Sequence, residues 1–256
     1  MMRRPDRFHL RVDVVRTSDN GDGLFEMGAM SFSSCVYLHG FASGPSSSKA
    51  KFFGAQLSQL GIPVTVPDLN KPTFAEMTLS SQLEVVQSSI ASRIATSEDA
   101  DDGSFLIVGS SMGGLVATLS AQDKAPHAHQ LKALILLAPG FGLPRRWTEL
   151  LGEVGLKHWK EKGFVDVFHH GANKELPLRY DFYLDAIKYT TEGLSVNVPT
   201  LVFHGQRDET VPVEESKEFQ RLNPDKVQLE ILDDDHQLLA SLDLMWKKTQ
   251  DFISKL

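Results

Sequence analysis

The sequence predicts an α/β fold in which helices cover both faces of a doubly wound, mostly parallel β-sheet. Three observations support this prediction. From residue 34 onward, short apolar segments alternate with longer segments of helical periodicity. The short segments are continuously apolar, as strands buried on both faces of a parallel sheet are. Strands and helices that alternate in this way form parallel sheets with right-handed crossovers.

The expected strands are short apolar runs followed by turn-forming residues. They are 35–38, 63–66, 105–108, 133–137, 200–203 and 227–232. One segment between them has the apolar spacing of a helix with a single buried face. Its apolar stripe consists of Leu83, Val86, Ile90 and Ile94. Further helices are expected at 49–60, 114–125, 213–222 and 238–256.

The first 33 residues precede this alternation. Their two partly apolar stretches, 8–15 and 24–32, flank a segment rich in turn formers. We therefore expect residues 1–33 to be an N-terminal extension that forms a hairpin at the edge of the sheet.

A second segment, residues 141–197, is much longer than one crossover requires. It contains three of the four tyrosines and two of the three tryptophans, and a structureless loop of that length is improbable inside a domain. We expect a small helical cap over the carboxyl ends of the strands, where open α/β sheets bind ligands. The core is then formed by 34–140 and 198–256.

The composition excludes several classes of protein. The chain has 256 residues and a net charge of -7, and it contains no run of basic residues, so nucleic-acid binding is not expected. Its single cysteine, Cys35, excludes a disulfide framework and a thiolate-rich metal site. The longest apolar stretch, 131–141, is interrupted by Lys132 and is shorter than the ~20 residues of a membrane span. No apolar stretch of a signal peptide follows the basic start, so we expect a cytoplasmic protein.

A G-x-S-x-G pattern follows the third expected strand and precedes a helix. It begins at Gly109 and ends at Gly113, with Ser111 at its centre. The glycines permit a tight turn that exposes the serine oxygen above the sheet, and the helix N-terminus favours an anion there. A glycine-rich turn with solvent-facing serines is the alternative. The flanking strand and helix favour Ser111 as a nucleophile.

A serine nucleophile requires a base that is oriented by a third group. Asp208 follows the strand at 200–203, and His236 follows the strand at 227–232, so both are expected at the same sheet edge as Ser111. We predict that His236 is the general base and that Asp208 orients it. Competing acids are Glu209 and the run 233–235. The adjacent pair His169 and His170 is poorly suited to hold one metal ion, and neither a metal nor a cofactor is expected.

Two backbone amides are expected to stabilise the oxyanion of an acyl-transfer reaction. One belongs to Met112, directly after the nucleophile, and the other to Phe41, in the loop that follows the first strand. Four further residues are candidates for substrate binding, with a turn or a solvated surface as the alternative. They are His39, Gly40, Arg145 and Trp147.

Four segments together resemble the α/β-hydrolase superfamily over residues 34–256: Leu38 to Phe41, 109–114, 204–208 and Asp235-His236. Within it, residues 37–43 followed by Ser48-Lys49-Ala50-Lys51 are similar to small bacterial esterases of the YqiA type. This resemblance implies a cytoplasmic, metal-free serine esterase or thioesterase. The long segment 141–197 departs from the shortest of those enzymes, so their substrate preference is not carried over.

The sequence therefore predicts a serine hydrolase that cleaves a small-molecule acyl ester or thioester through an acyl-enzyme on Ser111. The same side chains are compatible with a carbon–carbon bond hydrolase or a lyase, and a ligand-binding member of the fold with an idle triad is a further alternative. Acyl chain length, leaving group and oligomeric state are not indicated by the sequence.

Overall fold

The structure is a computed structural model that describes residues 32–95, 103–122, 125–191 and 193–256. The hairpin predicted within residues 1–33 lies outside these ranges, apart from Phe32 and Ser33 at its end.

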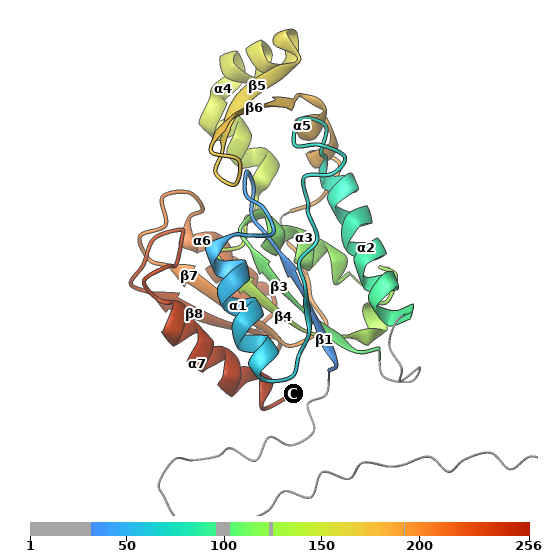
Figure 1. Cartoon of the computed structure of the whole chain (residues 1–256). Coiled ribbons are helices and arrows are strands. Elements are labelled where there is room, and N and C mark those ends of the chain that lie inside the picture. Colours follow the sequence, from blue (N-terminus) through green and yellow to red (C-terminus); the bar gives the residue numbers. More distant parts are fainter. Residues whose placement is uncertain (1–31, 96–102, 123–124, 192) are drawn as a thin grey trace, which may run out of the picture.

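A six-stranded parallel sheet forms the centre of the protein, as the sequence predicts (Figure 1). Its strand order is β2-β1-β3-β4-β7-β8. The bounds are β1 Ser34–Leu38, β2 Val64–Thr65, β3 Phe105–Ser110, β4 Leu131–Leu137, β7 Thr200–Gly205 and β8 Val227–Leu232. The strand β2 is shorter than predicted because it lies at the sheet edge and pairs with β1 alone.

Helices cover both faces of the sheet. The helices α1 (Ser48–Gln59) and α7 (Leu242–Ile253) pack side by side on one face (Figure 1). Side chains of α2 (Leu79–Ala95), α3 (Met112–Ser120) and α6 (Val213–Leu222) belong to the apolar cluster of the other face. Strand residues alternate between the two clusters, because successive side chains of a strand point to opposite faces. In β1, Cys35 and Tyr37 join the α1 and α7 side, whereas Val36 and Leu38 join the other.

Residues 143–186 lie above the carboxyl ends of the strands (Figure 1) and are called the cap from here on, whereas Phe141, Leu194 and Val196, within the range predicted for the cap, belong to an apolar cluster of the core. The cap is helical in part: α4 spans Leu143–Lys162 and α5 spans Asp181–Ala186. Between them the structure has an antiparallel hairpin, β5 (Phe164–His169) with β6 (Lys174–Arg179), where the sequence analysis expected helix alone. The reason is local: Gly163, at φ 82°, ends α4, and the following side chains alternate between less and more exposed positions, as in a strand.

An aromatic cluster attaches the cap to the core. Trp159, Leu178 and Phe182 of the cap are buried together with Met112 of α3 and Phe74. Burial of such side chains stabilises the cap by roughly 1.5–3 kcal/mol for each fully covered large apolar residue. The cap is therefore packed on the first residue of the helix that follows Ser111.

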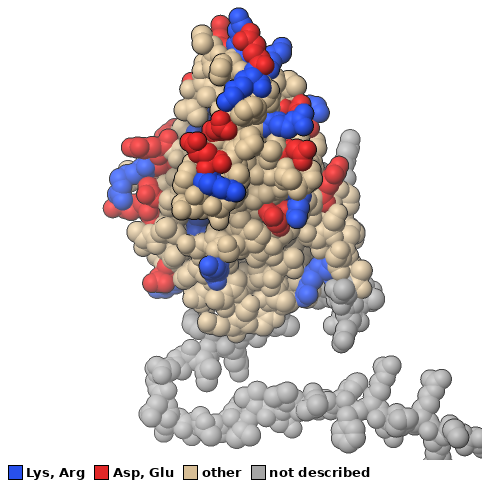
Figure 2. Space-filling view, turned by 45° about the horizontal axis from the view of Figure 1, so that its top comes forward, with Lys and Arg blue, Asp and Glu red and all other residues tan. Residues whose placement is uncertain are grey.

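Charges of both signs are interspersed over the cap and the neighbouring surface (Figure 2). Within the described ranges, no helix combines the length and the apolar character that crossing a membrane requires.

Candidate active site

Ser111 lies in the sharp turn between β3 and α3. Its backbone has φ 52° and ψ -119°, a combination that residues with a side chain rarely adopt. Such strained backbone conformations are concentrated at functional sites. Two glycines make the turn sterically feasible. A Cβ on Gly113 would lie 2.2 Å from the Leu38 carbonyl oxygen, and one on Gly109 would lie 2.5 Å from the Gly113 carbonyl oxygen. The glycines of the G-x-S-x-G pattern are thus required by close backbone approach.

Backbone hydrogen bonds hold this turn against the neighbouring strand. The Ser111 N–H donates to the Leu137 carbonyl at 2.8 Å. The Ser111 carbonyl accepts the N–H groups of Gly114 and Gly140, each at 2.8 Å. The strained residue is therefore fixed by β4 as well as by its own helix, which positions the serine oxygen before any ligand binds.

The structure brings Ser111, His236 and Asp208 together. His236 lies in the loop after β8, and its Nε2 is 2.9 Å from Ser111 Oγ. Asp208 lies in the loop after β7, and its Oδ2 is 2.7 Å from His236 Nδ1. Because a carboxylate only accepts, His236 Nδ1 carries the proton, and Nε2 is left to accept the hydroxyl hydrogen of Ser111.

Four groups donate hydrogen bonds to the buried carboxylate of Asp208. Its Oδ1 accepts the N–H groups of Thr210 and Val211 at 2.8 and 2.7 Å, and its Oδ2 faces His236 at 2.7 Å and His204 at 3.2 Å. Burial raises the pKa of Asp208, but the hydrogen bonds outweigh it and lower the pKa well below the usual range. Asp208 is therefore ionised at neutral pH. Among the described residues, none of the competing acids, Glu209 and the run 233–235, forms an ion pair with His236, and Asp233 pairs with Arg207 instead.

His204 is a member of this site that the sequence analysis did not assign. It is fully buried in β7, and its Nε2 faces two acceptors, the Val211 carbonyl at 2.9 Å and Asp208. Nε2 must therefore carry the proton, and Nδ1 accepts the hydroxyl of Ser216 at 2.7 Å. The available signal was its position at the end of a strand, four residues before Asp208.

The two predicted oxyanion donors flank Ser111. Met112 is the first residue of α3, so its N–H has no acceptor within the helix. Phe41 lies in the loop after β1, where a Cβ added to Gly40 would be 3.3 Å from Ser111 Cβ. The Phe41 ring packs against the rings of Phe74, Trp147 and Phe182. These ring contacts, two of them from the cap, hold the loop that lines the same cavity as Ser111.

Ser111 and His236 open into a cavity of about 790 Å³. Its walls come from the loop after β1 and the start of α1, from the tip of the cap hairpin, and from the loop after β8. Gly40 and Phe41 belong to the first wall and His170 to the second, although His170 was not predicted to be near the site. The cavity has the size of a site for a small organic molecule.

Of the remaining predicted substrate contacts, only Gly40 lines this cavity. His39 is buried beside it: its Nε2 accepts the Leu69 N–H at 3.0 Å, and its Nδ1 donates to the Gly40 carbonyl at 2.9 Å. Burial lowers the pKa of His39 and keeps it neutral in this structural role. Trp147 packs between Phe41 and Trp159 and supports the loop instead of lining the cavity.

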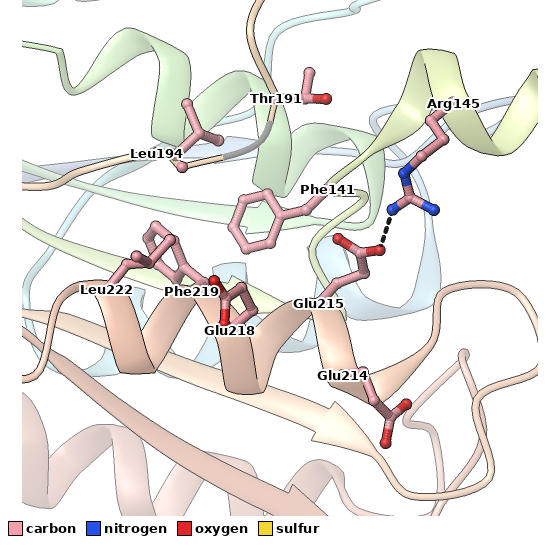
Figure 3. A pocket seen from close by; sticks show the side chains of 10 residues that line it. Phe141, Arg145, Thr191, Leu194, Glu214, Glu215, Glu218, Phe219 and Leu222 are labelled. Carbon is pink, nitrogen blue, oxygen red and sulfur yellow. Dashed lines mark hydrogen bonds and ion pairs between the residues drawn. The ribbon is translucent and has the colours of Figure 1, made fainter.

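The structure places Arg145 in a different hollow, of about 380 Å³, between α4 and α6 (Figure 3). Arg145 is paired there with Glu215 at 2.5 Å and with Glu149 at 2.7 Å. The prediction that Arg145 contacts the substrate is not supported by this position, because both acidic partners lie outside the Ser111 cavity.

Within the described part of the chain, no cluster of three or more His, Cys, Asp or Glu side chains is arranged to hold a metal ion. His169 accepts the Ala172 N–H and packs against Phe74, whereas His170 lines the cavity. The two adjacent histidines therefore have separate environments.

A parallel sheet with this strand order, a strained serine turn after β3 and a cap over the strand ends define the α/β-hydrolase fold. Residues 34–252 match the profile of the uncharacterised protein family UPF0227, and the chain belongs to this family. None of the curated protein sequences matches the chain significantly.

Solved structures of similar fold include several hydrolases by name. Est1E from Butyrivibrio proteoclasticus, in a structure with ferulic acid bound, has a TM-score of 0.73 and 22% identity, covering 87% of this chain and 88% of its own. Mouse alpha/beta hydrolase domain-containing protein 10 has a TM-score of 0.70 and 22% identity, covering 87% and 90%. The esterase Pf2001 from Pyrococcus furiosus has a TM-score of 0.61 and 17% identity, covering 87% and 82%.

Proposed function

We propose that the protein is a serine hydrolase of small carboxylic acyl esters or thioesters. The observation that carries this proposal is the chain of hydrogen bonds from Ser111 Oγ through His236 to the ionised Asp208, at the wall of an open cavity. Such an arrangement activates a hydroxyl that is otherwise a weak nucleophile at neutral pH.

In the first half of the reaction, Ser111 Oγ attacks the carbonyl carbon of the bound ester while His236 Nε2 takes its proton. Asp208 holds the imidazole in the required tautomer and stabilises the imidazolium without taking the proton itself. His236 then gives the proton to the leaving alcohol or thiol, and an acyl-enzyme on Ser111 remains.

The negative charge that develops on the carbonyl oxygen is stabilised by the backbone N–H groups of Met112 and Phe41. The N-terminal end of α3 adds its positive dipole at the same point. In the second half, His236 activates a water that attacks the acyl-enzyme. The acid is released when the proton returns to Ser111.

The cap forms one wall of the acyl site in this proposal, since the tip of its hairpin lines the cavity. The names of the structural neighbours support ester hydrolysis, because Est1E was solved with ferulic acid and Pf2001 is an esterase. A cavity of about 790 Å³ accommodates a substrate of that size.

The test is Ser111→Ala, assayed with p-nitrophenyl butyrate and with a fluorophosphonate probe. We expect hydrolysis to fall by a factor of roughly 10³ or more, and labelling to be lost, because no other residue supplies the attacking oxygen. Ser58→Ala, at an exposed position of α1, is the matched control and should retain both.

Activity that persists in the Ser111→Ala variant contradicts the proposal. Wild-type protein that cleaves a β-diketone but neither an ester nor a thioester would indicate a carbon–carbon bond hydrolase. Failure of the wild-type protein to react with the fluorophosphonate would indicate a ligand-binding member of the fold.

A further inference from the structure

Lys49 is a lysine in an unusual position. It is the second residue of α1, it lines the same cavity as Ser111, and it is only 8% exposed. Among the described residues it has no hydrogen-bonding or ion-pairing partner. Buried lysines are ordinarily paired, and unpaired ones usually extend their ammonium group into water.

The lining of the cavity has no acidic side chain to neutralise this lysine. Its ionisable members are Lys49, His170 and His236, and the rest of the lining is apolar, glycine, glutamine or hydroxyl-bearing. The hydroxyl groups are supplied mainly by the serine-rich loop before α1 and by the first residue of that helix. They are those of Ser43, Ser46, Ser47 and Ser48. A cavity that contains one cation, several hydroxyls and no carboxylate is suited to an anion.

Three carboxylates lie nearby without pairing with Lys49. Burial lowers the pKa of Lys49 to about 8, and the charges of Asp208, Asp235 and Asp234 oppose that shift. Lys49 is therefore protonated at neutral pH. Asp208 is saturated by its own donors, and Asp235 Oδ1 accepts the Gln237 N–H at 2.8 Å.

Asp234 is a further competitor for the ammonium group, beside Asp235. Its Oδ1 accepts the Asp235 N–H at 2.8 Å, but its buried Oδ2 has no hydrogen-bonding partner in the described structure. Asp234 does not line the cavity, and within the described ranges it forms no ion pair with Lys49. The experiment below separates a Lys49 that acts on Asp234 from one that acts on a ligand.

We propose that Lys49 binds an anionic group, a carboxylate or a phosphate, on the ester or thioester that Ser111 attacks. The proposal rests on the proposed function and narrows it from acyl esters in general to those that carry a negative charge. An ammonium group in a partly dehydrated cavity binds such a group as a point charge, with hydroxyls as additional donors.

The charge can belong to the acyl part or to the leaving group, and two matched substrate pairs distinguish these cases. The p-nitrophenyl monoester of glutaric acid is compared with p-nitrophenyl valerate, which has the same acyl length and no charge. Butyryl-coenzyme A, with its phosphates on the leaving group, is compared with butyryl-N-acetylcysteamine. Each pair is assayed with wild-type protein, Lys49→Met, Lys49→Arg and the control Lys51→Met, which changes an exposed lysine of the same helix.

We expect Lys49→Met to lower kcat/KM at least about tenfold for the charged member of one pair, mainly through KM, because a hydrogen bond to a charged group is lost. The neutral member should change by less than about threefold. Lys49→Arg should restore part of the preference, and Lys51→Met should behave as wild type. The pair that shows the effect identifies which part of the substrate carries the charge.

If Lys49→Met lowers kcat/KM equally for charged and neutral substrates, the proposal is overturned. Lys49 would then act by neutralising the nearby carboxylates of the protein, among them Asp234. Unchanged kinetics for both pairs would also overturn it. Binding is measured separately, as the thermal shift produced by glutarate and by coenzyme A in wild-type protein and in Lys49→Met. If no substrate is hydrolysed, the proposed function fails. The inference about Lys49 then stands only if one of these anions stabilises the wild-type protein and not the variant.

Discussion

At the scale of single residues, the site depends on the buried carboxylate of Asp208 and on its hydrogen bonds. Asp208 has no exposed side-chain surface and accepts bonds from two backbone amides and two histidines. That arrangement lowers its pKa well below the usual range, so it is ionised at neutral pH. An ionised Asp208 in turn fixes which nitrogen of His236 faces Ser111.

Asp208→Asn tests this dependence. The amide preserves the shape but can donate a hydrogen to His236 Nδ1, which favours the tautomer whose Nε2 cannot accept from Ser111. We expect kcat for p-nitrophenyl butyrate to fall by roughly 10⁴, because the wrong tautomer of His236 then faces Ser111. Glu209→Gln changes the exposed neighbour and should leave kcat unaltered. A similar kcat in both variants would remove Asp208 from the proposed mechanism.

Lys49 also gives the protein a pH-dependent stability. Its pKa is about 8 in the folded state against 10.5 when unperturbed, so the folded chain binds fewer protons than the unfolded chain between these values. The free energy of unfolding therefore rises with pH from about 8 to 10.5 through this group. At pH 7 the buried charge destabilises the fold by up to roughly 3 kcal/mol.

Lys49→Met should therefore be more stable than wild type at pH 7, and the difference should shrink as the pH rises to 10.5. Cys35 and Tyr37, whose pKa values are raised by burial, act in the opposite direction at high pH, but they are common to both proteins. Urea unfolding at pH 7 and at pH 10 measures the difference. A variant that is less stable than wild type at pH 7 would show that Lys49 has a stabilising partner, with Asp234 and Asp235 as the candidates.

At the scale of elements, the turn between β3 and α3 depends on how closely three backbone segments approach one another. Gly113 passes the end of β1, and Gly114 passes Pro139, where an added Cβ would meet Pro139 Cα at 2.9 Å. The helix α3 is consequently pressed against the sheet at its first turn. This contact directs the positive end of the helix at the cavity.

Gly113→Ala should strongly destabilise the protein, because its Cβ would meet backbone atoms of Leu38 and His39 that cannot move without disrupting β1. Gly54→Ala, within α1 and with open space around its Cβ position, is the matched substitution. It should leave the protein as stable or raise its stability by up to about 1 kcal/mol through helix propensity. Thermal unfolding compares the two, and equal effects would show that the close approach at Gly113 is relieved by small shifts.

The cap is the element whose form the sequence patterns described least completely. Apolar and polar residues partly alternate over Phe164–His169, which is a short pattern typical of a strand. The sequence analysis expected helix throughout 141–197 and did not use this pattern. The two strands of the hairpin pair with each other, and the hairpin is held by backbone hydrogen bonds to Ala42 and Ala75 and by packing against α4 and the aromatic cluster. Its secondary structure is therefore decided by contacts between segments that lie far apart in the chain.

At the scale of the whole molecule, the sheet order brings three separate loops to one edge. Strand β4 lies between β3 and β7, and β8 lies beyond β7, so Ser111, Asp208 and His236 approach from different strands. All six strands of the central sheet are parallel, and their carboxyl ends therefore meet at the same side, where the cap covers them. This is why three residues that each follow a different strand can lie side by side in the structure.

The sequence by itself determined the α/β architecture, because continuous apolar strands that alternate with helices have few other ways to be buried. It also determined Ser111, Asp208 and His236 as the group to test, since each follows a strand in a recognisable pattern. Only the tertiary structure decided that His204 contacts Asp208, that Arg145 pairs with Glu215 outside the cavity, and that Lys49 lies inside it. Those outcomes depend on which side chains from distant segments share a buried space, and local patterns contain no information about that.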